Sequence, residues 1–479
     1  MRWSPNQQKA IDTIGRNVVV SASAGAGKTA VLTARLTKRV AKDHVPVTSI
    51  LAMTFTEAAA AEMKSRLFSS LSNLLKDETD ETQRQYLQDQ LVLLGSAHVS
   101  TIHSFCLSLI KENYFMINLD PKTASNILSD EECTQLKEDA WVRAFNTMLQ
   151  KDEKEFTELC NYFSGRSDDY EALKANALKL ALVLSESENR EETILRFKSY
   201  LQPVQTLSQV HPEMMNIFME ACRSYALCIE NALDEALDII NKDQIDVASF
   251  ESSVRLRKEK LVPLKDALEQ MNYTEVYRII RNSCESPLGR VTKEEALKPV
   301  RKKIMDLCND AVAFLIPEDL LIQSINEMSS YGHTLIDLAD LIDQNYSQAK
   351  LDRQAMDFSD MEQFALKILL ADNKRTAKKM QRQFIDILVD EFQDTTDVQN
   401  TIIELISRGN NIFRVGDIKQ SIYRFRGARP QIMRDLIQTT DGSQEIIFLS
   451  ENYRSCKSIV EYNNYLFDVL MNIHGLSQS

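Results

Sequence analysis

A glycine-rich loop lies between a short apolar run and an amphipathic segment, and this arrangement constrains the fold more than any other feature. Residues 22–29 read ASAGAGKT and directly follow Val18, Val19 and Val20. The segment AVLTARLTKRV after the loop repeats apolar residues at helical spacing. A strand, a loop and a helix in this order predict a phosphate-binding loop, whose amide groups and helix N-terminus attract an anion.

The residues of this loop suit a nucleotide and a magnesium ion. We expect Lys28 to place its ammonium group near the β- and γ-phosphates and the Thr29 hydroxyl to hold Mg²⁺. Ala22 stands where the pattern G-x-x-x-x-G-K-[ST] has its first glycine. The other loop residues expected around the phosphates are Ser23, Ala24, Gly25, Ala26 and Gly27. The alternative is a flexible glycine and alanine turn with an exposed lysine.

A phosphate loop needs a partner carboxylate at the end of a neighbouring strand, and the segment IDILVDEFQD supplies it. Asp390, at the tip of this apolar run, is predicted to orient the Mg²⁺ shell. Glu391 is predicted to accept a proton from the water that attacks the phosphoryl group. The alternative is a solvated acidic loop after a strand.

Six strand-like runs lie in two groups near the ends of the chain: NVVVSAS, SILAMTF and AHVSTI, then IDILVDEF, NIFRVGD and EIIFLSEN. Short apolar runs without alternation are typical of parallel strands covered on both faces. Between Gly165 and Gly289 there is no glycine, and apolar residues recur at intervals of three and four. The predicted fold class is therefore α/β, with a parallel sheet interrupted by a large all-helical insertion at about 115–345.

The charge distribution gives two opposing indications about nucleic acid. The net charge of −13 argues weakly against such a partner, because phosphate binding usually leaves a basic footprint. Residues 411–434, however, contain six basic residues and one acidic residue. This basic segment is a local exception in an acidic protein.

The chain shows no sign of export, membrane insertion or zinc binding. It has no uncharged apolar run of about 18 residues and no apolar signal core at its N-terminus, so we expect a cytoplasmic protein without a membrane partner. Its eight cysteines form no C-x-x-C pair, and we expect them to be reduced and mostly buried.

Seven segments follow one another in a recognisable order: WSPNQQKAI, ASAGAGKT, TFTEAAAAEMKSR, VSTIHSFC, LVDEFQD, VGDIKQSIYRFRGARP and LSENYRS. They resemble the successive motifs of superfamily 1 DNA helicases of the UvrD/Rep type. VSTIHSFC followed by INLDP, together with MDFSDMEQFAL and KQSIYRFRGARP, is most similar to the AddA (RexA) subunits of bacterial helicase-nucleases. A UvrD-like or RecB-like repair helicase is the alternative within this group.

The resemblance implies a RecA-like P-loop NTPase core. Residues 1–114 would form the first part of motor domain 1A, 115–345 a 1B-like helical insertion, and 346–447 the second part of domain 1A. Residues 448–479 would begin the second motor domain, 2A.

Four further residues acquire nucleotide roles from the resemblance. Gln7 matches the glutamine that recognises adenine, and Gln420 matches the γ-phosphate sensor. Tyr453 resembles the aromatic residue that stacks on adenine, and Arg454 resembles the arginine finger. Without the resemblance, these would be two polar amides and a buried tyrosine beside a surface arginine.

The resemblance also implies a single-stranded DNA site built from aromatic, basic and hydroxyl side chains, a combination that binds without regard to sequence. The matching residues are Thr54, Phe55, Thr56, Thr101, His103, Tyr423, Phe425 and Arg426. Phe425 matches the base-stacking aromatic residue, and Gly427 is expected to permit close backbone approach. A histidine such as His103 more often packs or caps a helix than binds a ligand.

The predicted function is an ATP-dependent DNA helicase that uses Mg²⁺ and, by resemblance, moves 3′ to 5′ in double-strand break repair and recombination. Its expected partners are a single-stranded DNA tail, a duplex junction and an AddB/RexB-like subunit. The alternatives are a regulatory ATPase and a fragment that binds ATP and DNA without unwinding. Only 24 residues follow LSENYRS, so we expect a truncated second motor domain, no nuclease domain and no unwinding by this chain alone.

Overall fold

The computed structural model of the chain describes residues 3–151, 154–164, 169–243, 247–291, 294–439 and 442–473. The chain forms two compact units. The first comprises Met1–Lys151, Tyr170–Arg190 and Leu338–Lys457, and the second comprises Asp152–Asp169, Glu191–Asp337 and Ser458–Ser479. Residues 115–151, 170–190 and 338–345 thus belong to the unit that contains the sheet, although the sequence pattern assigned them to the insertion. The limits of the individual motor domains remain predictions.

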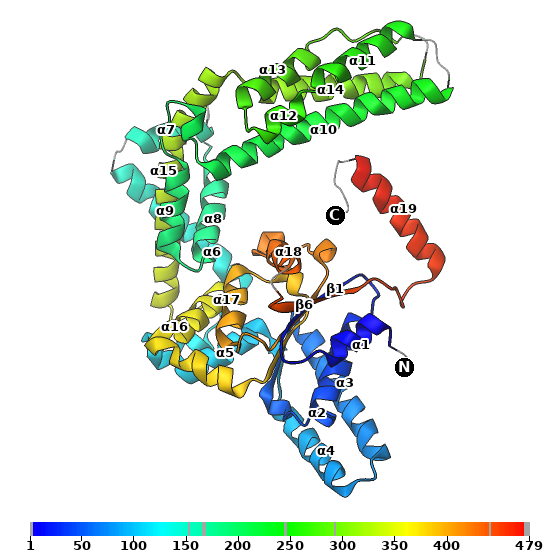
Figure 1. The fold of residues 1–479 in the computed structure, drawn as a ribbon. Helices are drawn as coiled ribbons and strands as arrows, with labels where there is room; N and C mark the ends of the chain where they lie inside the picture. The colour runs from blue at the N-terminus through cyan, green and yellow to red at the C-terminus, as the bar shows by residue number, and fades with distance from the viewer. Residues whose placement is uncertain are drawn as a thin grey trace. The chain divides into compact units, whose positions relative to one another are not determined.

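The first unit is built on a six-stranded sheet with the order β3-β2-β4-β5-β1-β6 (Figure 1). All neighbouring strands are parallel. The strands are β1 (Asn17–Ala22), β2 (Ile50–Thr54), β3 (His98–Thr101), β4 (Asp386–Val389), β5 (Ile412–Gly416) and β6 (Gln444–Leu449). Each arises from one of the six predicted runs, so the predicted α/β fold class is confirmed.

Helices cover both faces of this sheet, because every residue of β2, β4 and β5 is buried. One face carries α1 (Pro5–Asp12), α2 (Lys28–Ala41), α3 (Glu57–Asp77) and α4 (Glu81–Leu93). The other carries α5 (Ile102–Asn113), α16 (Phe358–Gln383), α17 (Asp397–Ile406) and α18 (Pro430–Gln438). Helices α6 (Asp130–Gln150) and α8 (Glu171–Ser185) also belong to this unit.

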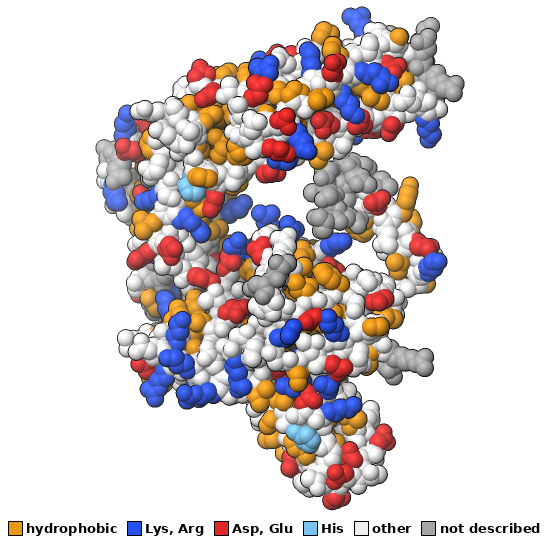
Figure 2. Space-filling model, viewed as in Figure 1, with side chains coloured by type: hydrophobic (Ala, Val, Ile, Leu, Met, Phe, Trp, Pro, Cys, Tyr) orange, Lys and Arg blue, Asp and Glu red, His pale blue; other side chains and the backbone are white. Residues whose placement is uncertain are grey.

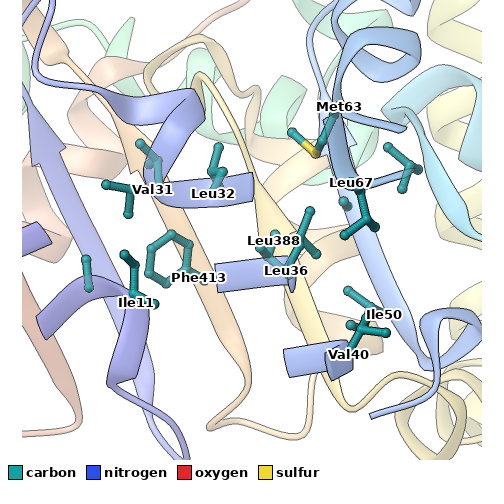
Figure 3. Close-up of a cluster of buried hydrophobic side chains, with 14 of the residues drawn as sticks. Ile11, Val31, Leu32, Leu36, Val40, Ile50, Met63, Leu67, Leu388 and Phe413 are labelled. Carbon is teal, nitrogen blue, oxygen red and sulfur yellow. The ribbon is translucent and has the colours of Figure 1, made fainter. Parts of the chain in front are cut away.

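The alternation of side chains along a strand divides the core between the two faces. Val18 and Val20 of β1 pack in the cluster with α2, whereas Val19 packs in the cluster with α5 and α16. Figure 3 shows the first cluster, in which Phe413 of β5 lies among side chains of α1 and α2 such as Ile11. This packing fixes α2, and therefore the loop before it, against the sheet.

The second unit is helical, as the glycine-free region predicted. Its core is formed by α10 (Pro212–Asp243), α11 (Ala248–Leu261), α12 (Leu264–Glu269), α13 (Tyr273–Cys284) and α14 (Leu297–Phe314). Basic and acidic side chains are interspersed over these helices (Figure 2), and Lys303 pairs with Glu235 at 2.9 Å. The remaining long helices are α7 (Lys154–Ser164), α9 (Arg190–Tyr200), α15 (Glu318–Asp352) and α19 (Lys457–Ile473). Over the described ranges, no helix has both the length and the hydrophobicity needed to cross a bilayer.

Candidate nucleotide and nucleic-acid site

The phosphate loop connects β1 to α2 at the carboxyl edge of the sheet. Gly25 and Gly27 have φ values of 76° and 85°, in the left-handed region that favours glycine. Ala22 is instead the last residue of β1, where it pairs with Leu449 and is 1% exposed. Its backbone is extended, so an alanine in place of the usual first glycine meets no conformational strain.

The carbonyl groups of the loop are held by the segment that follows β6. The Asn452 side chain donates to the Ala24 carbonyl at 2.9 Å, and the Tyr453 amide donates to the Gly25 carbonyl at 2.9 Å. The amides of Lys28 and Thr29 begin α2 and have no intrahelical acceptor, as at any helix N-terminus. The loop can therefore offer these N–H groups to an anion.

Lys28 and the acidic segment after β4 meet at this edge, as predicted. The Lys28 ammonium nitrogen lies 2.7 Å from Oε2 of Glu391. Glu391 has a φ of 50°, a strained value for a residue other than glycine. The same Oε2 accepts a hydrogen bond of 3.0 Å from the amide of Gln393, which is 2% exposed.

Gln393 links the acidic segment to the next strand and was not identified from the sequence. Its Oε1 accepts from the amide of Asp417, which follows β5, at 2.9 Å. A Cβ atom on the adjacent Gly416 would lie only 2.5 Å from this oxygen, so glycine is required there. The signal was available, because Gln393 lies inside the motif LVDEFQD.

Asp390 lies in a setting that disfavours its charge. Burial, followed by the neighbouring Glu391 carboxylate, raises the pKa of Asp390 to about 6. The amide of Glu391 donates to Asp390 at 3.0 Å. A cation bound at this carboxylate would reverse the pKa shift, and carboxylate and hydroxyl oxygens such as those of Asp390 and Thr29 are ligands that Mg²⁺ prefers. The donor set therefore fits the predicted metal.

Gln7, predicted to read adenine, is 4% exposed and braces the phosphate loop. Its Nε2 donates to the Ala26 carbonyl at 3.0 Å, and its Oε1 accepts from the Ser4 amide at 3.0 Å. A primary amide has two donors and two acceptor positions. Gln7 therefore retains one donor and one acceptor position beyond these contacts.

The other predicted nucleotide residues lie on either side of the loop. Gln420 donates from Nε2 to Asp417 at 2.7 Å in the segment after β5. The Tyr453 ring is 60% exposed, and the neighbouring Arg454 side chain is also exposed. The side-chain oxygen of Asn452 accepts from the Arg454 amide at 2.9 Å, so Asn452 positions this pair beside the loop.

A cavity of about 660 Å³ opens beside Asp390 and Glu391. Six of the predicted DNA-binding residues contribute to its lining: Thr54, Phe55, Thr56, His103, Tyr423 and Arg426. The Phe55 and Tyr423 rings lie 4.7 Å apart between centroids, and the Arg426 guanidinium lies 5.7 Å from the Tyr423 centroid. The three-dimensional structure thus brings three separate sequence motifs to one cavity. The side chain of Phe425 lies outside the described residues.

Two of the predicted DNA-binding residues are engaged with protein groups. Thr101 does not line the cavity; it is 7% exposed, and its hydroxyl donates to Glu57 at 2.8 Å while capping α5. His103 lines the cavity, with its Nε2 3.0 Å from the carboxylate of Glu362. Glu362 also accepts from Gln399 at 2.7 Å, so it joins the His103 motif to α17.

The close approach expected at Gly427 involves protein as well. A Cβ atom on Gly427, whose φ is 77°, would lie 2.8 Å from the carboxylate of Glu186 at the end of α8. Burial, followed by the charge of Glu362, raises the pKa of Glu186 to about 7. No sequence signal pointed to Glu186, because it lies in the helical region without a recognisable motif.

The basic segment 411–434 is less exposed than its composition suggested. Arg414 is 1% exposed and pairs with Glu404 beneath the surface, so it belongs to the core. A second basic strip lies on α16, towards the lower left of Figure 2. Its exposed members are Lys374, Arg375, Lys378, Lys379 and Arg382.

Comparison with known proteins agrees with this geometry. A family model described as the UvrD/REP helicase N-terminal domain matches residues 3–441. The chain is 32% identical to the ATP-dependent helicase/nuclease AddA of Exiguobacterium sibiricum, over 98% of this chain and 40% of that protein. It is also 32% identical to the corresponding protein of Listeria monocytogenes and 30% identical to that of Clostridium novyi, over 98% of this chain and 39% of each relative. The chain therefore spans about two fifths of the length of these relatives.

Proposed function

This chain belongs to the UvrD/REP helicase family, and we propose that it is the ATP-driven DNA motor of an AddA-type helicase-nuclease. The observation that carries the proposal is the meeting of Lys28, Glu391 and the cavity of predicted DNA residues at one edge of the sheet. Coupling of ATP turnover to movement on DNA requires such proximity. The relatives that are named as ATP-dependent helicase/nuclease proteins support the AddA assignment.

ATP would bind with its phosphates on the loop and its base beside Tyr453. Lys28 would leave Glu391 and pair with the β- and γ-phosphates, while the first amides of α2 donate to the phosphate oxygens. Gln7 would use its remaining donor and acceptor positions on the adenine edge. The exposed ring of Tyr453 offers a stacking surface.

Hydrolysis would depend on groups that are positioned before the reaction. Bound Mg²⁺, held through Thr29 and Asp390, supplies positive charge against the phosphate oxygens. Glu391 accepts the proton of the attacking water, and its strained backbone and Gln393 fix its carboxylate. Gln420 would sense the γ-phosphate, and Arg454 would stabilise the charge on the transferring group.

Single-stranded DNA would pass through the cavity between the Phe55 and Tyr423 motifs. Stacking on aromatic rings and contact with Arg426 bind any base and any phosphate, as a motor that moves along DNA requires. Phe425 is proposed to contribute a further stacking ring. By family resemblance the motor would move 3′ to 5′ with an AddB/RexB-like subunit, in cytoplasmic repair of double-strand breaks.

The test is ATP hydrolysis with and without single-stranded oligo-dT at saturating Mg-ATP. We expect a severalfold increase in turnover with DNA. An equal rate in both conditions would refute a DNA-coupled motor and favour the regulatory ATPase. Translocation on single strands that carry a block at the 5′ or the 3′ end then tests the direction.

A further inference from the structure

The core of the second unit contains a buried arginine beside two cysteines. Arg257 on α11 is 2% exposed, and its Nη1 donates to Sγ of Cys308 at 2.9 Å. Cys308 lies on α14 and is 3% exposed. Cys284, the last residue of α13, is 7% exposed and forms a side-chain hydrogen bond with Cys308.

A buried guanidinium group needs a countercharge, because desolvation of an unpaired cation is costly. Among the residues that the structure describes, no carboxylate forms an ion pair with Arg257, and its Nε has no hydrogen-bond partner. Its other contact is the neutral carbonyl of Ser286. The contacting group that can become an anion is therefore the thiol of Cys308.

We propose that Arg257 holds Cys308 as a thiolate and that Cys284 is its resolving partner, so that the pair forms a reversible disulfide with hydrogen peroxide. The site would be a redox modification site in the helical unit. It lies outside the nucleotide site, and its test does not depend on the proposed motor function.

The electrostatic environment agrees with the roles of the two thiols. The hydrogen bond from Cys284, together with the charge of Arg257, lowers the pKa of Cys308 to about 7 against the opposing effect of burial. The same hydrogen bond, followed by burial, raises the pKa of Cys284. One sulfur is thus prepared to attack, while the other keeps its proton until the second step.

The chemistry balances in two steps. The Cys308 thiolate attacks one peroxide oxygen, the O–O bond breaks, and hydroxide leaves, which oxidises Cys308 to a sulfenic acid. The Cys284 sulfur then attacks Cys308, its proton passes to the sulfenic oxygen, and water leaves as the S–S bond forms. In total, two thiols lose two electrons and two protons, and the peroxide becomes two water molecules.

The chain provides two internal reference cysteines. Cys222, in the same core, is fully buried, and burial raises its pKa to about 12. It should therefore stay reduced. Cys456 is exposed and reports the general oxidising strength of the treatment.

The experiment is non-reducing peptide mapping of the full chain after graded exposure to hydrogen peroxide. We expect a linked peptide containing Cys284 and Cys308 that dithiothreitol separates, while Cys222 remains a thiol. Arg257→Met should slow formation of this disulfide about tenfold, because the thiolate fraction falls. Arg257→Lys, which keeps the charge, should be slowed less.

A second variant keeps the proposal testable if Arg257 substitutions disturb folding. Cys284→Ser removes the resolving thiol, so dimedone should label Cys308 as a trapped sulfenic acid. The proposal is overturned if Cys308 stays reduced in both chains at a dose that oxidises half of Cys456. It is also overturned if a folded Arg257→Met chain forms the disulfide at the wild-type rate.

Discussion

The ammonium nitrogen of Lys28 lies 2.7 Å from Oε2 of Glu391, so the predicted phosphate ligand and the predicted general base neutralise each other in this structure. The two residues are 363 positions apart in the chain. A phosphate that takes up Lys28 would release the Glu391 carboxylate. Nucleotide binding and exposure of the base would then be one linked event.

Glu391→Gln should separate nucleotide binding from hydrolysis. The glutamine keeps the side-chain volume but cannot accept the proton, so ATP should still bind while turnover falls by about 10²–10⁴-fold. Lys28→Ala is the contrasting variant, in which affinity and turnover should both fall. Fluorescent-nucleotide titration and a phosphate-release assay measure the two quantities. Equal ATPase rates in wild type and Glu391→Gln would remove Glu391 from the catalytic role.

Gly25→Ala should abolish tight nucleotide binding while largely preserving the fold. The new Cβ would lie 2.7 Å from the Asn452 side chain, on a backbone with a φ of 76°. Asn452→Ala relieves the contact but not the backbone strain. The double variant should therefore recover only part of the lost affinity, as a double-mutant cycle by calorimetry would show. Full recovery would mean that steric contact alone had caused the loss.

Gln393→Met should destabilise the first unit by about 1–3 kcal/mol, because it removes the buried acceptor for the Asp417 amide. Methionine has a similar length, so the loss reports hydrogen bonding more than packing. Gln399→Met, at a less buried site, is the matched control and should cost less. Urea unfolding measures both. A Gln393→Met chain as stable as the wild type would show that this bridge contributes nothing.

Asp390→Asn should change how stability depends on pH. The folded chain retains the Asp390 proton up to about pH 6, whereas an unfolded aspartate loses it near 3.8. Stability contributed by this group therefore falls as the pH rises through this window. Asparagine should raise the free energy of unfolding at pH 7 by on the order of 2 kcal/mol and reduce the slope between pH 4 and 6. Parallel pH profiles for the two chains would contradict the assigned environment.

Tyr423→Ala should weaken binding of single-stranded DNA by about 1–3 kcal/mol, with little difference between poly-dT and mixed sequences. Tyr423→Phe keeps the ring that faces Phe55 and should bind nearly as well as the wild type. Fluorescence anisotropy with labelled oligonucleotides gives both affinities. If alanine and phenylalanine behave alike, the ring does not stack on a base.

The sequence by itself determined the elements and the class of chemistry. Strand, loop and helix around Lys28 follow from local apolar patterns and from glycines at positions that need a positive φ. The six apolar runs became the six strands because parallel strands buried on both faces require such runs. These properties are local, so they can be read from neighbouring residues.

Only the tertiary structure decided which distant groups meet and which charges are exposed. Glu186 reached Gly427, and Arg257 reached Cys308, through helix packing that no motif records. Arg414 counted as part of a basic segment until the sheet buried it. The physical reason is that hydrogen bonding, desolvation and charge pairing depend on three-dimensional neighbours, and packing of the whole unit selects those neighbours.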